Sequence, residues 1–396
     1  MNFKNNKRVL YISPDGIMEP LGDSQVLKYL EKLSIHFDIE LISFEKIEDL
    51  RDEDKLKKIQ QRCSEANINW HCRKYRKGVL VISQLVNILN LVLFPLAVIA
   101  RTNTSIIHIR SYLPGLCIPL LSLFSNFKLI FDIRGFWADE KHDRLGWDQK
   151  SLKYKFFKQL EKYLFKKADA VVTLTHGAKK YIKIKFNKDP EKIFVIRTCV
   201  DFEEFKPSNE PKGNTNLVIG YLGTIDTAYN FDKFLSFIKD IQKYNQQIEV
   251  RLLTKATKYE IEPYLDRHGL QDLNISNKYL GREELRDAIV AFDLLAFCLK
   301  ENFSILASMP TKIGESLACG IPILCNPFNE DITQIIREEG VGEIYDFVEP
   351  FSKLRYEALL IKIKSGEISG LCNKFSQKEF SLESGALSYK EIYQNI

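Results

Sequence analysis

The feature of this sequence that most constrains its fold is an alternation of short, fully apolar runs with longer segments of helical periodicity. Because the short runs are apolar throughout, they predict strands of a parallel sheet that helices cover on both faces. The predicted strands are residues 9–13, 39–44, 106–109, 129–132, 170–173 and 193–196 in the first half, and 218–222, 249–253, 294–297, 321–325 and 342–345 in the second. Such an alternation is typical of the α/β class.

A polar stretch interrupts this alternation near the middle of the chain. Residues 202–217 are rich in Pro, Gly and Asn and show no periodicity, as in a linker. The alternation restarts after them. We therefore predict two doubly wound, Rossmann-like domains, residues 1–206 and 215–380, that face each other across a cleft.

Composition excludes several classes of protein. The 396 residues are 45% hydrophobic and 28% charged, unlike a disordered or collagen-like chain. The eight cysteines form no CxxC pair, which argues against a zinc module and indicates reduced thiols in a cytoplasmic protein. Residues 1–8 are polar and precede the first strand directly, so we expect no signal peptide.

The two halves of the chain differ in charge. Residues 1–200 contain 35 Lys and Arg against 22 Asp and Glu, a net charge of +13, whereas the remainder carries −8. A basic half is typical of proteins that bind nucleic acid, an anionic membrane surface or a phosphorylated substrate. The basic residues form no helix-turn-helix, RNA-recognition motif or basic arm, so we expect no nucleic-acid partner.

Two segments of the basic half raise the question of a membrane. Residues 79–100 are long and apolar, but a polar stripe at helical spacing and an interruption at Pro95 argue against a membrane span. We predict a helix that either packs on the sheet or lies in a membrane surface. Residues 150–167 place seven lysines among aromatic and leucine side chains. They predict a solvated helix face or, equally, attraction to anionic lipid.

The segment most informative about chemistry is residues 308–326. Pro310 begins a helix at a position where its missing N–H costs nothing, and Gly320 ends it. The first turn of such a helix offers free N–H groups and a positive dipole end, which favour a diphosphate. Lys312 would add a mobile positive charge, and Glu315 can accept hydrogen bonds from ribose hydroxyls. An ordinary capped helix with both side chains in solvent is the alternative.

Several strings resemble a known family. Pro310-x-Lys-x-x-Glu followed by Ala-x-Gly-x-Pro-Ile resembles the donor-binding helix of retaining glycosyltransferases of the GT-B fold, in family four. Strings similar to the family's glycine loop, domain-crossover strand, linker and first nucleotide-domain strand follow in the family's order, at residues 20–27, 168–175, 195–207 and 219–224. The resemblance covers nearly the whole chain. It implies that a C-terminal helix, residues 381–396, crosses back onto the N-terminal domain.

Two further strings resemble bacterial surface-polysaccharide transferases. They are Arg110-Ser-Tyr-Leu-Pro-Gly and Phe131-Asp-Ile-Arg-Gly-Phe-Trp-Ala-Asp-Glu. Asp132 and Arg134 follow a predicted strand at its carboxyl end, where open α/β sheets bind ligands. A structural ion pair of Arg134 with a nearby carboxylate is the alternative. Many relatives carry a His where Arg134 stands.

The sequence also departs from the family pattern. The first of two glutamates eight residues apart would stand at position 307, which is Ala307, and the usual Arg after the nucleotide-domain glycine is Thr224. Tyr229 and Asn230 stand where a Lys is usual. These departures indicate either a subgroup with a rebuilt donor pocket or impaired catalysis. The first is favoured because the surrounding loops keep their glycines and spacing.

The resemblance implies a retaining, metal-independent glycosyltransferase without a cofactor, cytoplasmic and peripheral on the membrane. It would move a sugar from a nucleoside diphosphate, UDP above all, to a lipid-linked glycan in surface polysaccharide or glycoconjugate biosynthesis. The first domain would bind the acceptor and the second the donor. A non-catalytic scaffold that binds nucleotide sugars and a nucleotide-sugar epimerase of the same fold are the alternatives.

These assignments give the expected site residues. The catalytic ones are Asp132, Arg134 and Lys312; the donor-binding ones are Gly223, Thr224, Lys255, Arg282, Ser308, Pro310, Thr311 and Glu315; the acceptor-binding ones are Gly22, Asp23, Asp139, Glu140 and His176. No metal ligand is expected, because Asp52-Glu-Asp54 lies in a charged helical stretch. His108, in an apolar strand, is interpreted as a core histidine.

Overall fold

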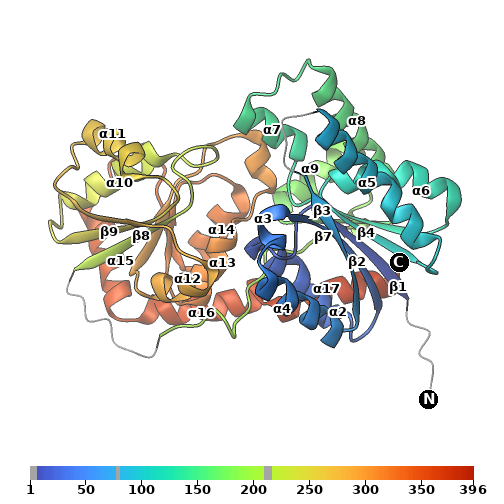
Figure 1. Ribbon diagram of the computed structural model, residues 1–396. Helices are drawn as coiled ribbons and strands as arrows, with labels where there is room; N and C mark the ends of the chain where they lie inside the picture. Colours follow the sequence, from blue (N-terminus) through green and yellow to red (C-terminus); the bar gives the residue numbers. More distant parts are fainter. Residues whose placement is uncertain (1–6, 77–80, 209–215) are drawn as a thin grey trace. The chain divides into compact units, whose positions relative to one another are not determined.

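The computed structural model describes residues 7–76, 81–208 and 216–396 (Figure 1). The chain divides into two compact units: the N-terminal unit is Met1–Cys199 with Leu382–Ile396, and the C-terminal unit is Val200–Ser381. Both units are α/β domains built on a parallel sheet. Three predictions extend beyond the described residues. They are the polar start of the chain at residues 1–6, the beginning of the apolar segment at residues 79–80, and the linker at residues 209–215.

The N-terminal unit contains a seven-stranded sheet in the order β3-β2-β1-β4-β5-β6-β7, with parallel pairing throughout. Its strands are β1 (Arg8–Ser13), β2 (Asp38–Lys46), β3 (Ile68–Tyr75), β4 (Ile106–Arg110), β5 (Lys128–Asp132), β6 (Ala170–Thr173) and β7 (Ile193–Val195). The sequence predicted all of these except β3. That strand lies at the sheet edge and is half exposed, so it lacks the continuous apolar run of its neighbours.

Helices cover both faces of this sheet (Figure 1). One face carries α2 (Lys28–Leu33), α4 (Glu53–Glu65) and α17 (Leu382–Asn395), and the other carries α5 (Val81–Ile99), α6 (Ile118–Phe124) and α8 (Leu152–Lys167). The remaining helical elements of this unit are α1 (Pro20–Gly22), η1 (Asp23–Leu27), α3 (Ile47–Leu50), η2 (Leu113–Cys117), α7 (Trp137–Leu145), α9 (His176–Phe186) and η3 (Pro190–Lys192).

The C-terminal helix α17 belongs to the N-terminal unit, as the sequence resemblance predicted. Its Tyr393 is fully buried and packs edge-on against Phe37, with ring centroids 5.1 Å apart. The Tyr393 hydroxyl is also 2.7 Å from Nδ1 of His108 on β4. His108 is therefore a buried core histidine with a hydrogen-bond partner, as interpreted from the sequence.

Helix α5 packs on the unit by one side only. Its Leu91 and Val98 are buried. Its Leu85, Ile88, Leu89 and Leu93 follow one another at helical spacing and remain 45–55% exposed. The packing alternative is thus confirmed for the buried side of the helix. The alternative that the helix lies in a membrane surface stays a prediction. Within the described residues, no helix combines the length and the apolar character needed to cross a membrane.

The C-terminal unit contains a six-stranded parallel sheet in the order β10-β9-β8-β11-β12-β13. Its strands are β8 (Leu217–Leu222), β9 (Ile248–Leu253), β10 (Asn274–Lys278), β11 (Leu294–Phe297), β12 (Ile323–Cys325) and β13 (Gly342–Ile344). Its helices are α10 (Phe231–Gln242), α11 (Lys258–His268), α12 (Arg282–Val290), η4 (Phe303–Ala307), α13 (Thr311–Ala318), α14 (Glu330–Glu339), α15 (Lys353–Lys364) and α16 (Glu367–Phe380). The sequence missed only β10, another half-exposed edge strand.

The strand order reverses beside the first strand of each sheet. In the N-terminal unit the reversal lies between β1 and β4, and in the C-terminal unit it lies between β8 and β11. Ligands of open α/β sheets bind at the carboxyl ends of strands at such a point. Each unit therefore has one edge at which a ligand site is expected.

Candidate functional site

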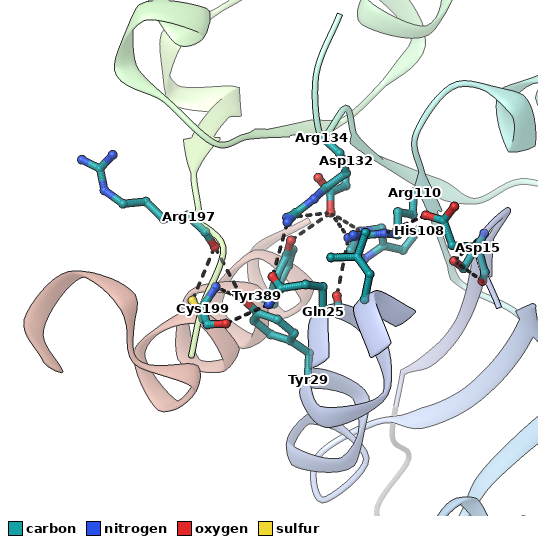
Figure 2. Close-up of polar contacts among 12 residues, drawn as sticks. Asp15, Gln25, Tyr29, His108, Arg110, Asp132, Arg134, Arg197, Cys199 and Tyr389 are labelled. Atoms are coloured by element: carbon teal, nitrogen blue, oxygen red, sulfur yellow. Dashed lines mark hydrogen bonds and ion pairs between the residues drawn. The ribbon is translucent and has the colours of Figure 1, made fainter. Parts of the chain in front are cut away.

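In the N-terminal unit, charged side chains gather at the carboxyl ends of β4 and β5. Asp132, the last residue of β5, is completely buried. Its Oδ2 accepts a hydrogen bond of 3.0 Å from the hydroxyl of Tyr389. The guanidinium groups of Arg110 and Arg134 flank the same oxygen at 3.8 and 3.7 Å (Figure 2). The resulting cluster, Arg110, Asp132 and Arg134, is called the arginine cluster below.

The charges of the arginine cluster stabilise one another. Burial alone would raise the pKa of Asp132, but Arg134, His108 and Arg110 together hold it below its usual value. Burial lowers the pKa of His108, against the opposing effect of Asp132. Asp132 is thus an ionised carboxylate that positions two arginines. Its predicted catalytic role would require contact with a substrate, and the side chain has no exposed surface.

The backbone around the cluster is strained. Arg134 has φ +54° and Ser111, which follows Arg110, has φ +63°. Non-glycine residues seldom adopt this left-handed conformation, and such strain concentrates at functional sites. The N–H of Ser111 donates to the carbonyl of Asp132 at 2.7 Å, which couples the ends of the two strands. Both guanidinium groups lie by Oδ2 of Asp132 at this edge of the sheet.

The glycine loop between β1 and α1 folds onto a buried carboxylate. The N–H groups of Ile17 and Met18 donate to Glu45, the oxygens lying 2.9 and 3.0 Å away. A Cβ at Gly22 would lie 1.9 Å from the carbonyl oxygen of Gly16, so only glycine fits there. The loop's first N–H groups are therefore occupied by the protein itself.

Asp23, another predicted acceptor residue, is held by an ion pair. Its carboxylate is 2.7 Å from Arg62 of α4, which also pairs with Glu31. The geometry therefore gives Asp23 a structural partner. Its role toward an acceptor stays a prediction.

Two neighbouring carboxylates on α7 have different surroundings. Asp139 is buried; it accepts a hydrogen bond from the hydroxyl of Tyr154 at 2.6 Å and pairs with Lys158 at 2.9 Å. Glu140 is partly exposed, and its carboxylate makes no hydrogen bond or ion pair within the described part of the chain. It lies beside Gly135, where an added Cβ would be 2.2 Å from its Oε1. Burial raises the pKa of Glu140.

His176 is the exposed first residue of α9. A histidine at this place could face a ligand or, alternatively, cap the helix. The cap is Thr175, whose side chain accepts from the N–H of Ala178. The capping alternative for His176 is therefore wrong.

In the C-terminal unit, α13 begins at Thr311 with Pro310 as N-cap, and Gly320 ends it with φ +77°. Lys312 is buried and not a mobile surface charge. Its ammonium donates to the carbonyl of Leu222 and lies 4.0 and 3.9 Å from the ring centroids of Tyr229 and Phe297. Burial holds its pKa well below the usual value. The expectation of a solvent-accessible cation at this position is thus corrected.

Glu315 is also buried and is paired within its own unit. Its Oε1 is 2.5 Å from Nη1 of Arg282, whose Nε lies 2.7 Å from Glu204. Burial raises the pKa of Glu315, and Arg282 opposes that effect. Arg282 and Glu315, both predicted to bind the donor, therefore lie together, but each neutralises the charge of the other.

The loop after β8 is the remaining part of the predicted donor site. Gly223 has φ +139°, and an added Cβ would lie 2.9 Å from the Tyr229 ring. Its N–H donates to the carbonyl of Leu253 at 3.2 Å and is not free for a phosphate, contrary to expectation. Thr224, the next residue, is exposed. Lys255 is an exposed cation at the end of the neighbouring strand β9, 4.8 Å from the ring centroid of Tyr279.

A pocket of about 360 Å³ opens in the same unit, at the carboxyl ends of β11 and β12. It is lined by Glu301, Asn302, Phe303, Leu306, Pro327, Phe328 and Asn329. Ser308 adjoins it, since its carbonyl accepts a hydrogen bond of 2.9 Å from Asn329. Ala307, the position of the missing glutamate, is fully buried. The volume lies in the range of small-molecule sites.

Sequence reasoning missed several members of these sites. Arg110 belongs to one of the family-like strings and no role was predicted for it, although its place directly after the predicted strand 106–109 was a signal. Gln25 and Tyr389 reach the arginine cluster from distant segments, and no local pattern indicates that. Arg282 was named as donor-binding, but its pairing with Glu315 was not foreseen.

Comparison with known proteins adds a family and a fold. Residues 62–204 match the family described as Glycosyltransferase Family 4. Solved structures similar to the chain include sucrose-phosphate synthase from Thermosynechococcus elongatus (TM-score 0.68, 13% identity, 98% of each chain covered) and a glycosyltransferase from Rickettsia africae (0.68, 15%, 98% of each). They also include HepE from Anabaena in complex with UDP and glucose (0.71, 12%, 98% of this chain and 100% of that one).

At these identities the structural likeness establishes the fold alone, which is the GT-B fold of these enzymes. No curated protein matches the sequence significantly.

Proposed function

We propose that this chain, which has the GT-B fold, is a family 4 glycosyltransferase that moves a sugar from a nucleoside-diphosphate sugar to a lipid-linked glycan acceptor with retention of configuration. The C-terminal unit binds the donor and the N-terminal unit binds the acceptor. UDP is the favoured nucleotide, because the similar HepE structure holds UDP. The process it serves is the assembly of a bacterial surface polysaccharide or glycoconjugate.

The observation that carries this proposal is the gathering of charged groups at the strand ends beside both switch points. The N-terminal unit has the arginine cluster there. The C-terminal unit has the pair of Arg282 with Glu315, Lys255 after β9 and the start of α13, and its 360 Å³ pocket opens at the carboxyl ends of β11 and β12. A transferase needs such groups where negative charge builds on the departing diphosphate.

The residues of the donor site divide into those that contact the donor and those that position it. Thr224 and Lys255 are exposed and Thr311 is half-buried at the start of α13, so a diphosphate can approach these three residues, and the helix dipole of α13 adds to their attraction. Lys312 acts through the end of β8, because its ammonium holds the carbonyl of Leu222. Glu315 binds the ribose once the two ribose hydroxyls have replaced Arg282 as its hydrogen-bond partners. No metal and no cofactor take part in this scheme.

The same proposal places the enzyme on the inner face of the cell membrane. The apolar stripe of α5 is joined by α6, which contacts α5 and ends in the exposed Leu123 and Phe124 (Figure 1). Exposed Lys74, Arg76 and Arg101 flank α5 at its two ends in the sequence. Apolar side chains between cations suit the interface of an anionic bilayer.

A second function, a scaffold that binds nucleotide sugars without turnover, is favoured by a different observation. Ala307 is buried where the family has a glutamate, and Thr224 stands where it has an arginine. Lys312 and Glu315 are both occupied by protein partners. A scaffold needs binding and not stabilisation of the departing diphosphate.

Calorimetric titration of the full chain with UDP, GDP, CMP and their sugar conjugates, in EDTA, tests the proposal. Selective binding of one diphosphate at micromolar concentration, followed by sugar transfer to an isoprenyl-diphosphate-linked glycan, is the expected result. Binding without transfer to any glycan supports the scaffold. Absence of binding across the panel contradicts both functions, and a requirement for added Mg²⁺ contradicts metal independence.

A further inference from the structure

At the carboxyl edge of the N-terminal sheet, two guanidinium groups carry more N–H donors than their surroundings accept. Arg110 is 4% exposed; it interacts with the Tyr11 hydroxyl, and its other contacts are with the Gln25 carbonyl at 3.5 Å, Asp15 at 3.7 Å and Asp132 at 3.8 Å. A good N–H···O hydrogen bond measures about 2.7–3.2 Å. The Nε of Arg110 is buried and has no hydrogen-bond partner among the described residues.

Arg134 repeats this pattern from the next strand. Its contacts with acceptors are to Oε1 of Gln25 at 3.5 Å and to Oδ2 of Asp132 at 3.7 Å. Because a guanidinium has several donors in one plane, these long contacts leave most of them without a close acceptor. A buried donor without an acceptor costs free energy that a suitable ligand recovers.

The balance of charge in the arginine cluster also indicates an anion. Asp132 balances one of the two positive charges, and its Oδ2 already accepts from Tyr389 at 3.0 Å. Among the described residues, the other carboxylate that pairs with either arginine is Asp15, which is half exposed and 3.7 Å from Arg110. Figure 2 shows both guanidinium groups directed at the Asp132 carboxylate, so an anion bound beside that carboxylate would meet both of them.

We propose that Arg110 and Arg134 together bind a phosphate group of a substrate, an inference that rests on the proposed function. One guanidinium satisfies both oxygens of a planar carboxylate, whereas a phosphate presents three oxygens in different directions. Two guanidinium groups on neighbouring strands, on either side of Asp132, suit the second geometry. Asp132 and Tyr389 position the arginines and do not contact the ligand.

Such a phosphate has two sources in the proposed reaction, the nucleoside diphosphate of the donor and the diphosphate of a lipid-linked acceptor. The test titrates the full chain with UDP, farnesyl diphosphate, inorganic pyrophosphate and glucuronate. Arg110→Gln and Arg134→Gln should each weaken phosphate binding at least tenfold. Arg51→Gln, at an exposed arginine of the same unit, is the matched control and should leave every affinity unchanged.

The pattern of losses identifies the source. A loss confined to farnesyl diphosphate assigns the site to the acceptor, a loss confined to UDP assigns it to the donor, and both support the inference. Equal affinities in wild type and variants for all phosphate probes overturn it. Selective binding of glucuronate, lost in the variants, overturns it as well.

Two measurements keep the test decisive if the glutamine variants fail to fold. Arg134→Lys keeps a charge opposite Asp132 but loses the fork of donors, and it should weaken binding roughly threefold to tenfold. In the wild type, pyrophosphate should raise the melting temperature, and glucuronate should not. No rise with pyrophosphate or farnesyl diphosphate contradicts the inference. If a nucleotide sugar binds and is turned over while the arginine variants match wild type, this inference fails and the proposed function stands.

Discussion

Arg282 and Glu315 form an ion pair in which Nη1 of the arginine lies 2.5 Å from Oε1 of the glutamate. The carboxylate that the family resemblance assigns to the ribose is therefore satisfied inside the C-terminal unit. Arg282 also pairs with Glu204, and its guanidinium carbon lies 4.6 Å from the ring centroid of Phe205. The ribose hydroxyls of a nucleotide that reaches Glu315 must therefore displace this guanidinium from the carboxylate.

Removal of Arg282 should destabilise the protein more than the loss of a surface ion pair. Arg282→Gln leaves Glu315 buried without its counter-charge, so we expect the free energy of unfolding to fall by about 2–3 kcal/mol. Glu315→Gln added to it should restore part of that loss. Urea denaturation of the two single variants and the double variant measures the coupling between the residues.

Arg251→Gln is the matched control for this cycle. Arg251 pairs with Glu249 at 2.6 Å, but both side chains are partly exposed on β9. Its loss should cost less than about 1 kcal/mol. A coupling between Arg282 and Glu315 no larger than the effect of this control would show that the buried pair does not stabilise the unit.

The pH dependence of stability should report the state of Lys312. Burial lowers its pKa well below the usual value, so above the folded-state pKa the unfolded chain binds more protons than the folded one. The contribution of Lys312 to the free energy of unfolding therefore rises with pH up to the usual pKa of lysine, about 10.4, and falls as the pH is lowered. Lys312→Met should remove a rise of at most about 1.4 kcal/mol per pH unit.

Denaturation curves between neutral and alkaline pH test this prediction. Lys258→Met, at a lysine 85% exposed on α11, should leave the slope of wild type unchanged. Equal slopes for Lys312→Met and wild type would mean that the ammonium stays charged among the rings of Tyr229 and Phe297. In that case the substitution would remove a cation–π contact and would leave the pH dependence of stability unchanged.

Asp139 and Glu140 should respond differently to the same kind of substitution. Asp139→Asn weakens the contacts with Tyr154 and Lys158, and the unfolding free energy should fall by about 2 kcal/mol. Glu140→Gln should leave stability at pH 7 unchanged or slightly higher. Burial raises the pKa of Glu140, so its charged form costs stability above the usual pKa, and the neutral amide avoids that cost.

Sugar transfer should be affected in the opposite order, with the larger loss in Glu140→Gln and the smaller loss in Asp139→Asn. Glu140→Gln should lower kcat/KM for the acceptor at least tenfold and leave the Kd of the donor unchanged, because the carboxylate is free to accept from an acceptor hydroxyl. Transfer by Asp139→Asn, measured well below its melting temperature, should stay closer to wild type. An acceptor kcat/KM of Glu140→Gln within twofold of wild type would remove Glu140 from the acceptor site.

The sequence predicted most strands because a strand buried on both faces is apolar throughout. It missed β3 and β10 for the opposite reason, since an edge strand is half exposed and carries polar residues such as Asn69 and Asn277. The positions of Asp132 and Arg134 were predictable from the strand that precedes them. Tyr389, which holds Asp132, lies 257 residues further along the chain. No periodicity reports such a contact.

The fate of individual side chains on a helix was less predictable than the helix itself. Pro310 and Gly320 gave the bounds of α13 almost to the residue. Whether Lys312 meets solvent depends on Tyr229 and Phe297, which come from other elements. The different surroundings of Asp139 and Glu140 likewise depend on α8, whose Lys158 reaches one carboxylate and not the other. Such facts need tertiary packing.

The apolar stripe of α5 should bind an anionic bilayer. Wild-type protein is expected to float with vesicles that contain phosphatidylglycerol and to stay in solution with vesicles of phosphatidylcholine alone. Leu89→Asp with Leu93→Asp places charges on the stripe, where both leucines are about half exposed and their burial in lipid would each contribute about 1 kcal/mol. Binding should fall at least tenfold. Leu354→Asp, at an exposed leucine of α15, is the control. Equal flotation of the α5 variant and wild type would contradict membrane binding through this stripe. If wild type instead forms dimers that depend on concentration, and the same variant abolishes them, the stripe binds a second copy of the chain.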